Sequence, residues 1–377
     1  MKSKAQYCVF SLIFVLGCVS AFQAHAIDLQ TIPKLKLVET MEEEAFNKET
    51  KLYSDTPFGD EFLAYEVRIP KDWTQGETYT AEKGESASVS LDILGNIARF
   101  DGPPRLDARS YFTLEALNLD YETTARSWFM NFILSNGYTI QGMDEISDRE
   151  LNALYIYVED DISYATRLAA RINGPRIIVA RYFVPLDDFE DEKIIQAQSM
   201  TSFKLTNTTG KQIEIRKTYD FLDQSHFDYP VSWQLNASDI MSIERMNAEI
   251  FSLSESEEMN GRIQIMIVSR LLDTSLSSEV TKFMDSFSIK NYELGSLIES
   301  HDFKHHPDMD FVKTQSYKLE PYAPTMMKYE YWASLLQNDD YYYIVTMLTP
   351  ARNAEYFLWT KNVEAFRVVL SSIRRYE

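Results

Sequence analysis

Cysteine is almost absent from this chain of 377 residues, and its placement is informative. The two cysteines, Cys8 and Cys18, both lie within the first 26 residues. If those residues are removed, the rest of the chain can form no disulfide and offers no thiolate to a metal or a substrate. The remaining length is enough to bury a hydrophobic core without covalent cross-links, and it favours two domains.

Glycine is also scarce, with 12 residues in the whole chain. The sequence contains neither a phosphate-binding glycine loop nor a Gly-x-Gly-x-x-Gly dinucleotide turn. It also lacks the Gly-x-Ser-x-Gly pattern of a serine nucleophile. Because no catalytic motif stands out, we expect a non-enzymatic protein without a cofactor.

Basic residues are outnumbered, with 37 Lys and Arg against 57 Asp and Glu, and the formal net charge is −20. A surface of this sign repels phosphate backbones and anionic lipid, which argues against nucleic-acid binding. The chain nevertheless carries 22 Phe, 23 Tyr and 5 Trp. So many aromatic side chains are typical of a folded protein and not of an acidic disordered tail.

Only one long apolar run occurs, at residues 7–19, and it is shorter than the ~20 residues that a membrane-spanning helix needs. Lys2 and Lys4 precede it, and Ala-His-Ala ending at Ala26 follows it. This layout predicts a signal peptide over residues 1–26 and a periplasmic or secreted protein without an integral membrane span. Val-Leu-Gly before Cys18 resembles a lipobox, so the alternative is a lipid anchor at Cys18 and a membrane-tethered lipoprotein.

Residues 27–52 are charged and weakly periodic, which indicates a linker or an exposed helix. Beyond them, alternating apolar residues at 63–69 and 154–158 predict strands, and residues 121–136 predict a helix that ends at Gly137. An apolar run closed by Pro185 and a helix to about residue 203 complete this set. After the polar stretch 206–212, the same order of elements returns.

Three landmarks recur in the same order at nearly constant spacing: Trp73 with Trp233, Pro185 with Pro350, and Ser202 with Ser372. The repetition predicts an α+β protein of two tandem domains, each a mainly antiparallel β-sheet flanked by helices. We place the first domain at 53–205, a linker at 206–212 and the second domain at 213–377.

A strand that runs into Pro-x-x-Trp, followed by a meandering sheet and an amphipathic closing helix, resembles the PsbP-like (DcrB-like) α/β/α sandwich superfamily. The matching segments are 69–73 with 199–205, and 229–233 with 365–374. The resemblance covers most of residues 53–377 and implies a central antiparallel sheet between helices. It also implies an extracytoplasmic accessory or binding role, and it brings no catalytic residues.

The Pro-x-x-Trp pairs, Pro70 with Trp73 and Pro230 with Trp233, have two interpretations. Proline tolerates the end of an edge strand, and tryptophan supplies a large area for packing, so the pairs can be determinants of the fold. The alternative is that both tryptophans are exposed and recognise a partner.

Three histidines cluster at the only segment that suggests a metal, within residues 301–310. Imidazole and carboxylate suit zinc, copper or nickel, so His301, His305, His306 and Asp308 are candidate ligands. The alternative is an ordinary polar loop, because Pro307 forbids a helix beyond it.

The signal peptide, the tandem repeat and the missing catalytic motifs together favour an exported binding or assembly module of the cell envelope. We expect it to contact an envelope protein through a sheet face or through the groove between its domains. The alternative function is a metal-binding protein or metal-dependent hydrolase that uses the segment from His301 to Asp310.

Overall fold

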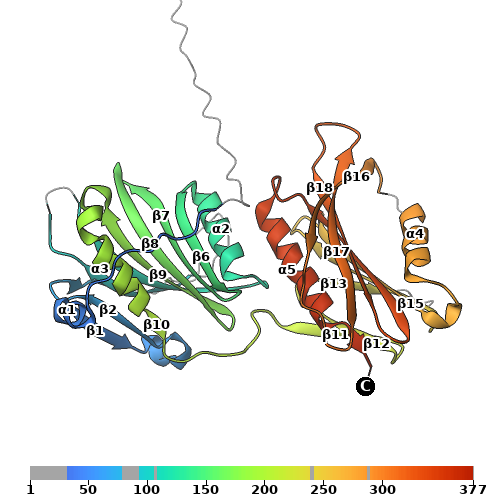
Figure 1. Ribbon diagram of the computed structural model, residues 1–377, viewed down its shortest axis with the longest axis horizontal. Helices are drawn as coiled ribbons and strands as arrows, with labels where there is room; N and C mark the ends of the chain where they lie inside the picture. Colours follow the sequence, from blue (N-terminus) through green and yellow to red (C-terminus); the bar gives the residue numbers. More distant parts are fainter. Residues whose placement is uncertain (1–31, 79–92, 106–107, 238–241, 287–288, 377) are drawn as a thin grey trace, which may run out of the picture. The chain divides into compact units, whose positions relative to one another are not determined.

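The computed structural model describes residues 32–78, 93–105, 108–237, 242–286 and 289–376, and the predicted signal segment 1–26 with Cys18 lies outside them. From Pro33 onward the chain forms one compact unit. Two sets of elements follow one another within it, and each set contains a seven-stranded and a three-stranded sheet (Figure 1).

The first set comprises α1 (Glu43–Glu49), β1 (Thr50–Asp55), β2 (Tyr65–Pro70), β3 (Thr74–Gln75), β4 (Ile93–Asp101), β5 (Tyr111–Asn118), α2 (Ala125–Asn136), β6 (Thr139–Ser147), β7 (Glu150–Glu159), β8 (Ile162–Asn173), β9 (Arg176–Pro185), α3 (Phe189–Ser202) and β10 (Lys204–Leu205). The second comprises β11 (Arg216–Phe221), β12 (Ser225–Pro230), β13 (Gln234–Ala237), β14 (Arg245–Leu253), β15 (Met259–Ser269), α4 (Leu276–Ser286), β16 (Tyr292–His301), β17 (Asp310–Pro321), β18 (Tyr329–Gln337), β19 (Tyr341–Pro350), α5 (Tyr356–Ser372) and β20 (Arg374–Arg375). We call these sets the first and second repeat.

The two large sheets have the same topology. Their strand orders are β3-β4-β5-β9-β8-β7-β6 and β13-β14-β15-β19-β18-β17-β16, and every pairing is antiparallel. The prediction of two tandem α+β units with mainly antiparallel sheets is therefore confirmed. The domain boundaries 53–205 and 213–377 stay a prediction, and β1 already begins at Thr50, inside the segment that the sequence assigns to a linker or exposed helix.

Helices cover both faces of each large sheet. In the first repeat α2 packs on one face, where Phe129 meets Tyr155, and α3 packs on the other, where Gln196 donates to the main-chain oxygens of Ala165 and Tyr182. In the second repeat α5 covers the face that carries Trp332, while Phe283 of α4 packs on the opposite face.

The repeated landmarks have the same role in both repeats. Trp73 and Trp233 are 7% and 2% exposed, so they are determinants of the fold and not exposed recognition residues. The Ser202 Oγ accepts the Arg68 amide at 2.8 Å, and the Ser372 Oγ accepts the Asp228 amide at 2.9 Å. Each serine thus joins the end of the closing helix of its repeat to the middle strand of the small sheet, β2 or β12.

Local sequence explains where several helices and strands begin and end. The Thr124 hydroxyl accepts the Ser127 amide at 3.0 Å and caps the start of α2. Gly137 ends that helix with φ of 68°, a left-handed conformation that costs glycine little. Pro185 and Pro350 close the two central strands β9 and β19, as predicted. Among the described residues, no helix is long and apolar enough to cross a membrane.

Candidate functional site: the cleft between the repeats

The two repeats contact each other mainly through α2 and α5 (Figure 1). The Asn131 amide donates to the Thr360 hydroxyl at 3.1 Å, and the rings of Tyr121 and Phe357 lie 5.2 Å apart, edge to face. One of these contacts is a hydrogen bond and the other is an aromatic pair.

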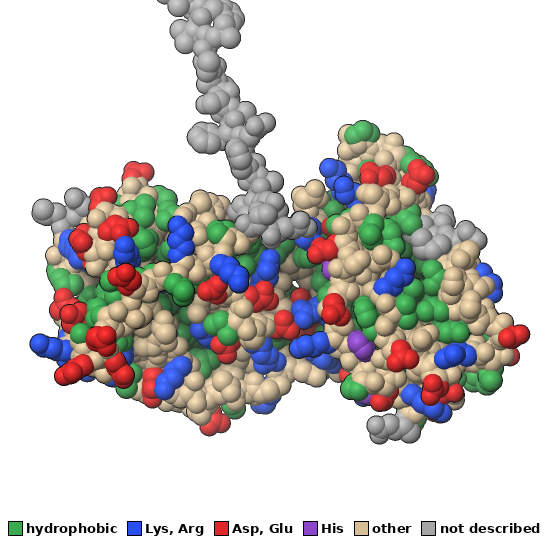
Figure 2. Space-filling model, in the orientation of Figure 1, with side chains coloured by type: hydrophobic (Ala, Val, Ile, Leu, Met, Phe, Trp, Pro, Cys, Tyr) green, Lys and Arg blue, Asp and Glu red, His purple; other side chains and the backbone are tan. Residues whose placement is uncertain are grey.

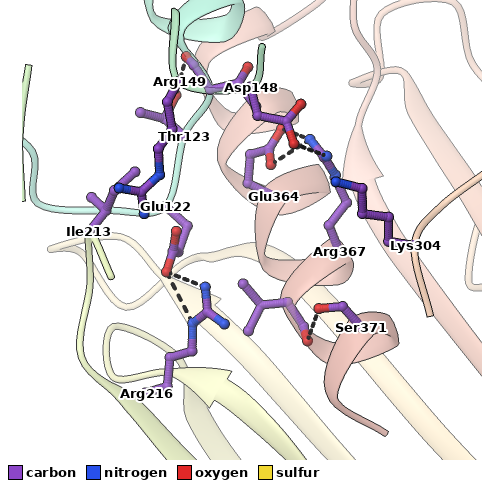
Figure 3. Close-up of a pocket in the computed structure, with 12 residues that line it drawn as sticks. Glu122, Thr123, Asp148, Arg149, Ile213, Arg216, Lys304, Glu364, Arg367 and Ser371 are labelled. Carbon is purple, nitrogen blue, oxygen red and sulfur yellow. Dashed lines mark hydrogen bonds and ion pairs between the residues drawn. The ribbon is translucent and has the colours of Figure 1, made fainter. Parts of the chain in front are cut away.

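Beside this contact lies a cavity of about 230 Å³. Both repeats contribute to its lining: Glu122, Thr123, Thr124, Asp148, Arg149, Ile213, Arg216, Lys304, Glu364, Arg367, Val368 and Ser371 (Figure 3). We call this cavity the inter-repeat cleft. Acidic and basic side chains gather together on the surface where the repeats meet (Figure 2).

Arg367 of α5 connects the two repeats. One guanidinium nitrogen lies 3.1 Å from a Glu364 carboxylate oxygen, and another lies 3.0 Å from the Asp148 carboxylate, in the turn between β6 and β7. Figure 3 shows Arg367 pointing between the two acids. One arginine therefore shares its charge between a neighbour on its own helix and an acid of the other repeat.

The Glu364 carboxyl is largely buried, with its side chain 12% exposed. Burial disfavours the charged form and raises its pKa to about 7, although the positive charge of Arg367 opposes the shift. The negative charges of Asp148 and Glu122 add to the rise. Glu364 thus changes its charge near neutral pH inside the inter-repeat cleft.

A second ion pair crosses between the repeats. Arg216, on β11, donates through Nε and Nη2 to one oxygen of Glu122 at 3.1 and 2.7 Å. Arg149 donates instead to the main-chain oxygens of Thr209 and Lys211, at 3.3 and 3.0 Å. Because those acceptors are neutral carbonyls, Arg149 steadies the connection between the repeats and keeps an uncompensated charge.

Lys304 also lines the inter-repeat cleft, is exposed, and forms no ion pair with a described residue. Four cations of the lining therefore face three carboxylates, and two of the cations, Lys304 and Arg149, are not neutralised by any of these acids. On a chain with a formal net charge of −20, this is a local reversal of sign. Such a site favours hydrogen-bonding or anionic groups of a binding partner over cations.

Two histidines of the predicted metal site stack on aromatic rings. The His301 ring stacks on Trp332 with centroids 4.0 Å apart, and its Nε2 lies 3.0 Å from the Ser316 hydroxyl. Burial lowers the pKa of His301. His305 stacks on Phe311 with a centroid distance of 5.4 Å.

The remaining pair of candidate ligands does come together, since the Nδ1 of His306 lies 3.3 Å from the Asp308 carboxylate. Within the described part of the chain, however, no three His, Cys, Asp or Glu residues form a group that could hold a metal ion. The metal site at His301, His305, His306 and Asp308 stays a prediction.

Sequence analysis missed Glu364, Arg367 and Asp148. The only available signal was the spacing of Glu364 and Arg367, three residues apart on the closing helix, away from its apolar stripe. That spacing is common on solvated helices and does not point to a site. Asp148 is 219 positions away from Arg367 in the sequence, so its role depends on the fold.

No family model and no curated protein sequence matches the chain. Among solved structures, cyanobacterial PsbP (CyanoP) from Synechocystis sp. PCC 6803 is 14% identical, covers 42% of this chain and 92% of its own, and has a TM-score of 0.29. The immunity protein TplEi of the T6SS from Pseudomonas aeruginosa is 10% identical, with coverages of 83% and 94% and a TM-score of 0.20. At these scores the similarity assigns neither family nor function, and the PsbP-like resemblance stays a prediction.

Proposed function

We propose that this protein is an exported, non-enzymatic binding module of the cell envelope and that its protein partner contacts the inter-repeat cleft. The export signal at residues 1–26 and the absence of catalytic motifs motivate the first part of the proposal. The second part depends on the charge pattern of the cleft, which combines side chains of both repeats.

The observation that carries the proposal is the uncompensated charge of Lys304 and Arg149 beside two ion pairs that cross between the repeats. Lys304 is exposed and free to meet a carboxylate or a main-chain oxygen of a partner. Arg149 and Arg367 would hold the surrounding surface in place while the partner binds. Interfaces of this polar type gain specificity from charge complementarity.

The test compares two charge reversals in an affinity capture from envelope extract. Lys304→Glu changes the inter-repeat cleft, and Lys313→Glu changes an equally exposed lysine on β17 that does not line it. The wild-type chain should retain one stoichiometric partner, Lys304→Glu should lose it at least tenfold, and Lys313→Glu should keep it.

Two results contradict the proposal. Equal capture by both variants would place the partner elsewhere on the surface. Recovery of no stoichiometric partner, together with turnover of a substrate panel by the wild-type chain, would favour an enzyme.

Location is proposed separately, as periplasmic or secreted, with a lipoprotein tethered through Cys18 as the alternative. Mass spectrometry of the mature amino terminus distinguishes them. A chain that starts at Ile27 supports the soluble form, and a lipidated Cys18 supports the tether.

A further inference from the structure

A second cavity, of about 280 Å³, lies in the second repeat under α4. It is formed on the face of the large sheet that is opposite to α5, and Phe283 of α4 is part of its lining. Figure 1 shows α4 and α5 on opposite sides of this sheet. Its volume is slightly below the ~300 Å³ at which pockets for small molecules usually begin. A ligand of this cavity is therefore small.

Strand registers show how its floor is built. Asn236 pairs with Glu249, and Glu249 pairs with Gln264, so these three side chains form one row across β13, β14 and β15. In the adjacent row Asn247 pairs with Met266, and Met266 with Ile344 of β19. A polar row and a partly apolar row thus lie side by side on one face.

The first repeat shows which side chains occupy the corresponding positions of its own large sheet. Counting back from the prolines that close β9 and β19, Arg181 corresponds to Thr346 and Val179 to Ile344. Glu115 pairs with Val179 and Met266 pairs with Ile344, so Glu115 corresponds to Met266. In the first repeat Arg181 forms an ion pair with Glu115, and its guanidinium lies 5.9 Å from the ring of Phe132 on α2.

Phe283 occupies the position on α4 that Phe132 occupies on α2, counted from the serine or threonine that precedes each helix. The second repeat thus keeps the aromatic wall but replaces the arginine beneath it with Thr346 and the glutamate with Met266. Met266 lines the cavity, so the residue that replaces the glutamate forms part of its floor.

The chemistry of the lining identifies a class of ligand. Asn236, Asn247 and Gln264 each offer a donor and an acceptor, and none of their amides hydrogen-bonds to a residue in the described ranges. Glu249 lies 3.5 Å from Arg262, so its charge is paired. The cavity therefore suits a neutral ligand whose groups both donate and accept.

A peptide strand fits this surface less well. β14 and β15 carry most of the polar lining and each have a neighbouring strand on both sides, so an added strand could pair only with β13 at the edge of the sheet. Hydroxyl groups both donate and accept, and the C–H face of a sugar ring can pack on Phe283 and Met266. We propose that this cavity binds a neutral sugar ring, as a site separate from the inter-repeat cleft.

The experiment uses saturation-transfer NMR on the purified chain with methyl glucoside, methyl galactoside and methyl N-acetylglucosaminide as probes. At least one glycoside should receive saturation from the wild-type protein. The double variant Asn247→Ala/Gln264→Ala should reduce the effect at least tenfold, because it removes two amides from the lining. Both side chains are polar and not part of the core, so the variant should still fold. Gln337→Ala, on the same face but outside the cavity, should leave it unchanged.

A filled cavity gives an independent check. Thr346→Arg/Met266→Glu places the ion pair of the first repeat under Phe283, and it should also abolish transfer while the thermal unfolding transition remains cooperative. The proposal is overturned by absence of transfer to every glycoside in the wild type, or by equal transfer in all variants. Transfer only to N-acetylglycinamide, added as a peptide probe, would overturn it in favour of a peptide ligand.

Discussion

Helices α2 and α4 occupy the same place in the two repeats but are held there by different interactions. On α2, Phe129 and Ile133 are completely buried against the sheet. On α4, the apolar side chains of Val280 and Phe283 are only half-buried. Among the residues 276–283 of α4, whose burial is described, the buried one is Glu279, which is 1% exposed and lies 2.8 Å from Arg245 of β14.

The difference shows that one topology can use two kinds of helix attachment. Glu279 occupies the position of Trp128 when the two helices are aligned at their starts. Its carboxylate also meets Lys282 at 2.7 Å and the Thr274 hydroxyl at 2.8 Å. Ion pairs fix the position of α4, and Phe283 of this helix lines the cavity beneath it.

The largest expected effect is the loss of stability when an apolar side chain that attaches α2 to the sheet is removed. Phe129→Ala should destabilise the protein by about 3–5 kcal/mol, because it removes a completely buried ring. Val280→Ala, at the matching position of α4, should cost only about 1 kcal/mol, since the side chain is half-buried. Urea unfolding of both variants measures the two free energies, and equal values would contradict the comparison.

The next effect concerns the ion pairs of α4. Glu279→Gln should cost about 1–3 kcal/mol, below the full value for a buried pair because Arg245 and Lys282 are exposed. The hydrogen bond from Arg245 is the main reason that the pKa of Glu279 falls to about 2. Its stabilisation is therefore present above the ordinary carboxyl pKa and is lost as the pH falls toward 2. Unfolding from pH 7 to pH 2 should show this loss in the wild type and not in Glu279→Gln.

Glu364 should produce the opposite pH dependence. Because burial raises its pKa from 4.5 to about 7, the folded state binds the proton more tightly than the unfolded state. Stability contributed by this group is full below pH ~4.5 and decreases as the pH rises to about 7. Glu364→Gln should remove this decrease, which thermal unfolding between pH 5 and pH 8 detects. An unchanged profile would show that Glu364 titrates normally.

A smaller effect is expected for the ion pair between the repeats. Arg367 and Asp148 have side chains that are 29% and 51% exposed, so solvent weakens their attraction. A double-mutant cycle with Arg367→Ala and Asp148→Ala should give a coupling energy of about 0.2–1 kcal/mol. A coupling near zero would show that this contact does not join the repeats in solution.

The smallest effect on stability is expected from the histidines, which occur as a cluster only in the second repeat. If the predicted metal site exists, elemental analysis should find metal in the wild type and less in His305→Ala/His306→Ala. His226→Ala, on β12, is the control and should retain the metal content. A metal-free wild type ends the metal hypothesis.

Sequence predicted the repeat because its landmarks act locally. Pro185 and Pro350 end strands, and Trp73 and Trp233 pack close to the strands that precede them. The alternation of apolar and polar residues predicted individual strands, and Gly137 predicted the end of α2.

The inter-repeat cleft could not be predicted in the same way. The ion pairs of Arg367 with Asp148 and of Arg216 with Glu122 join residues 219 and 94 positions apart. Their partners are chosen by how the repeats pack, and neither spacing nor periodicity records that choice. Similarly, Glu279 resembles an ordinary surface residue until the fold brings Arg245 beside it.

Site-specific photo-cross-linking tests most directly whether the partner contacts the inter-repeat cleft. A photo-reactive amino acid in place of Lys304 should label one envelope protein, and the same amino acid in place of Lys313 should not. Labelling of that protein from position 313 but not from position 304 would contradict the account.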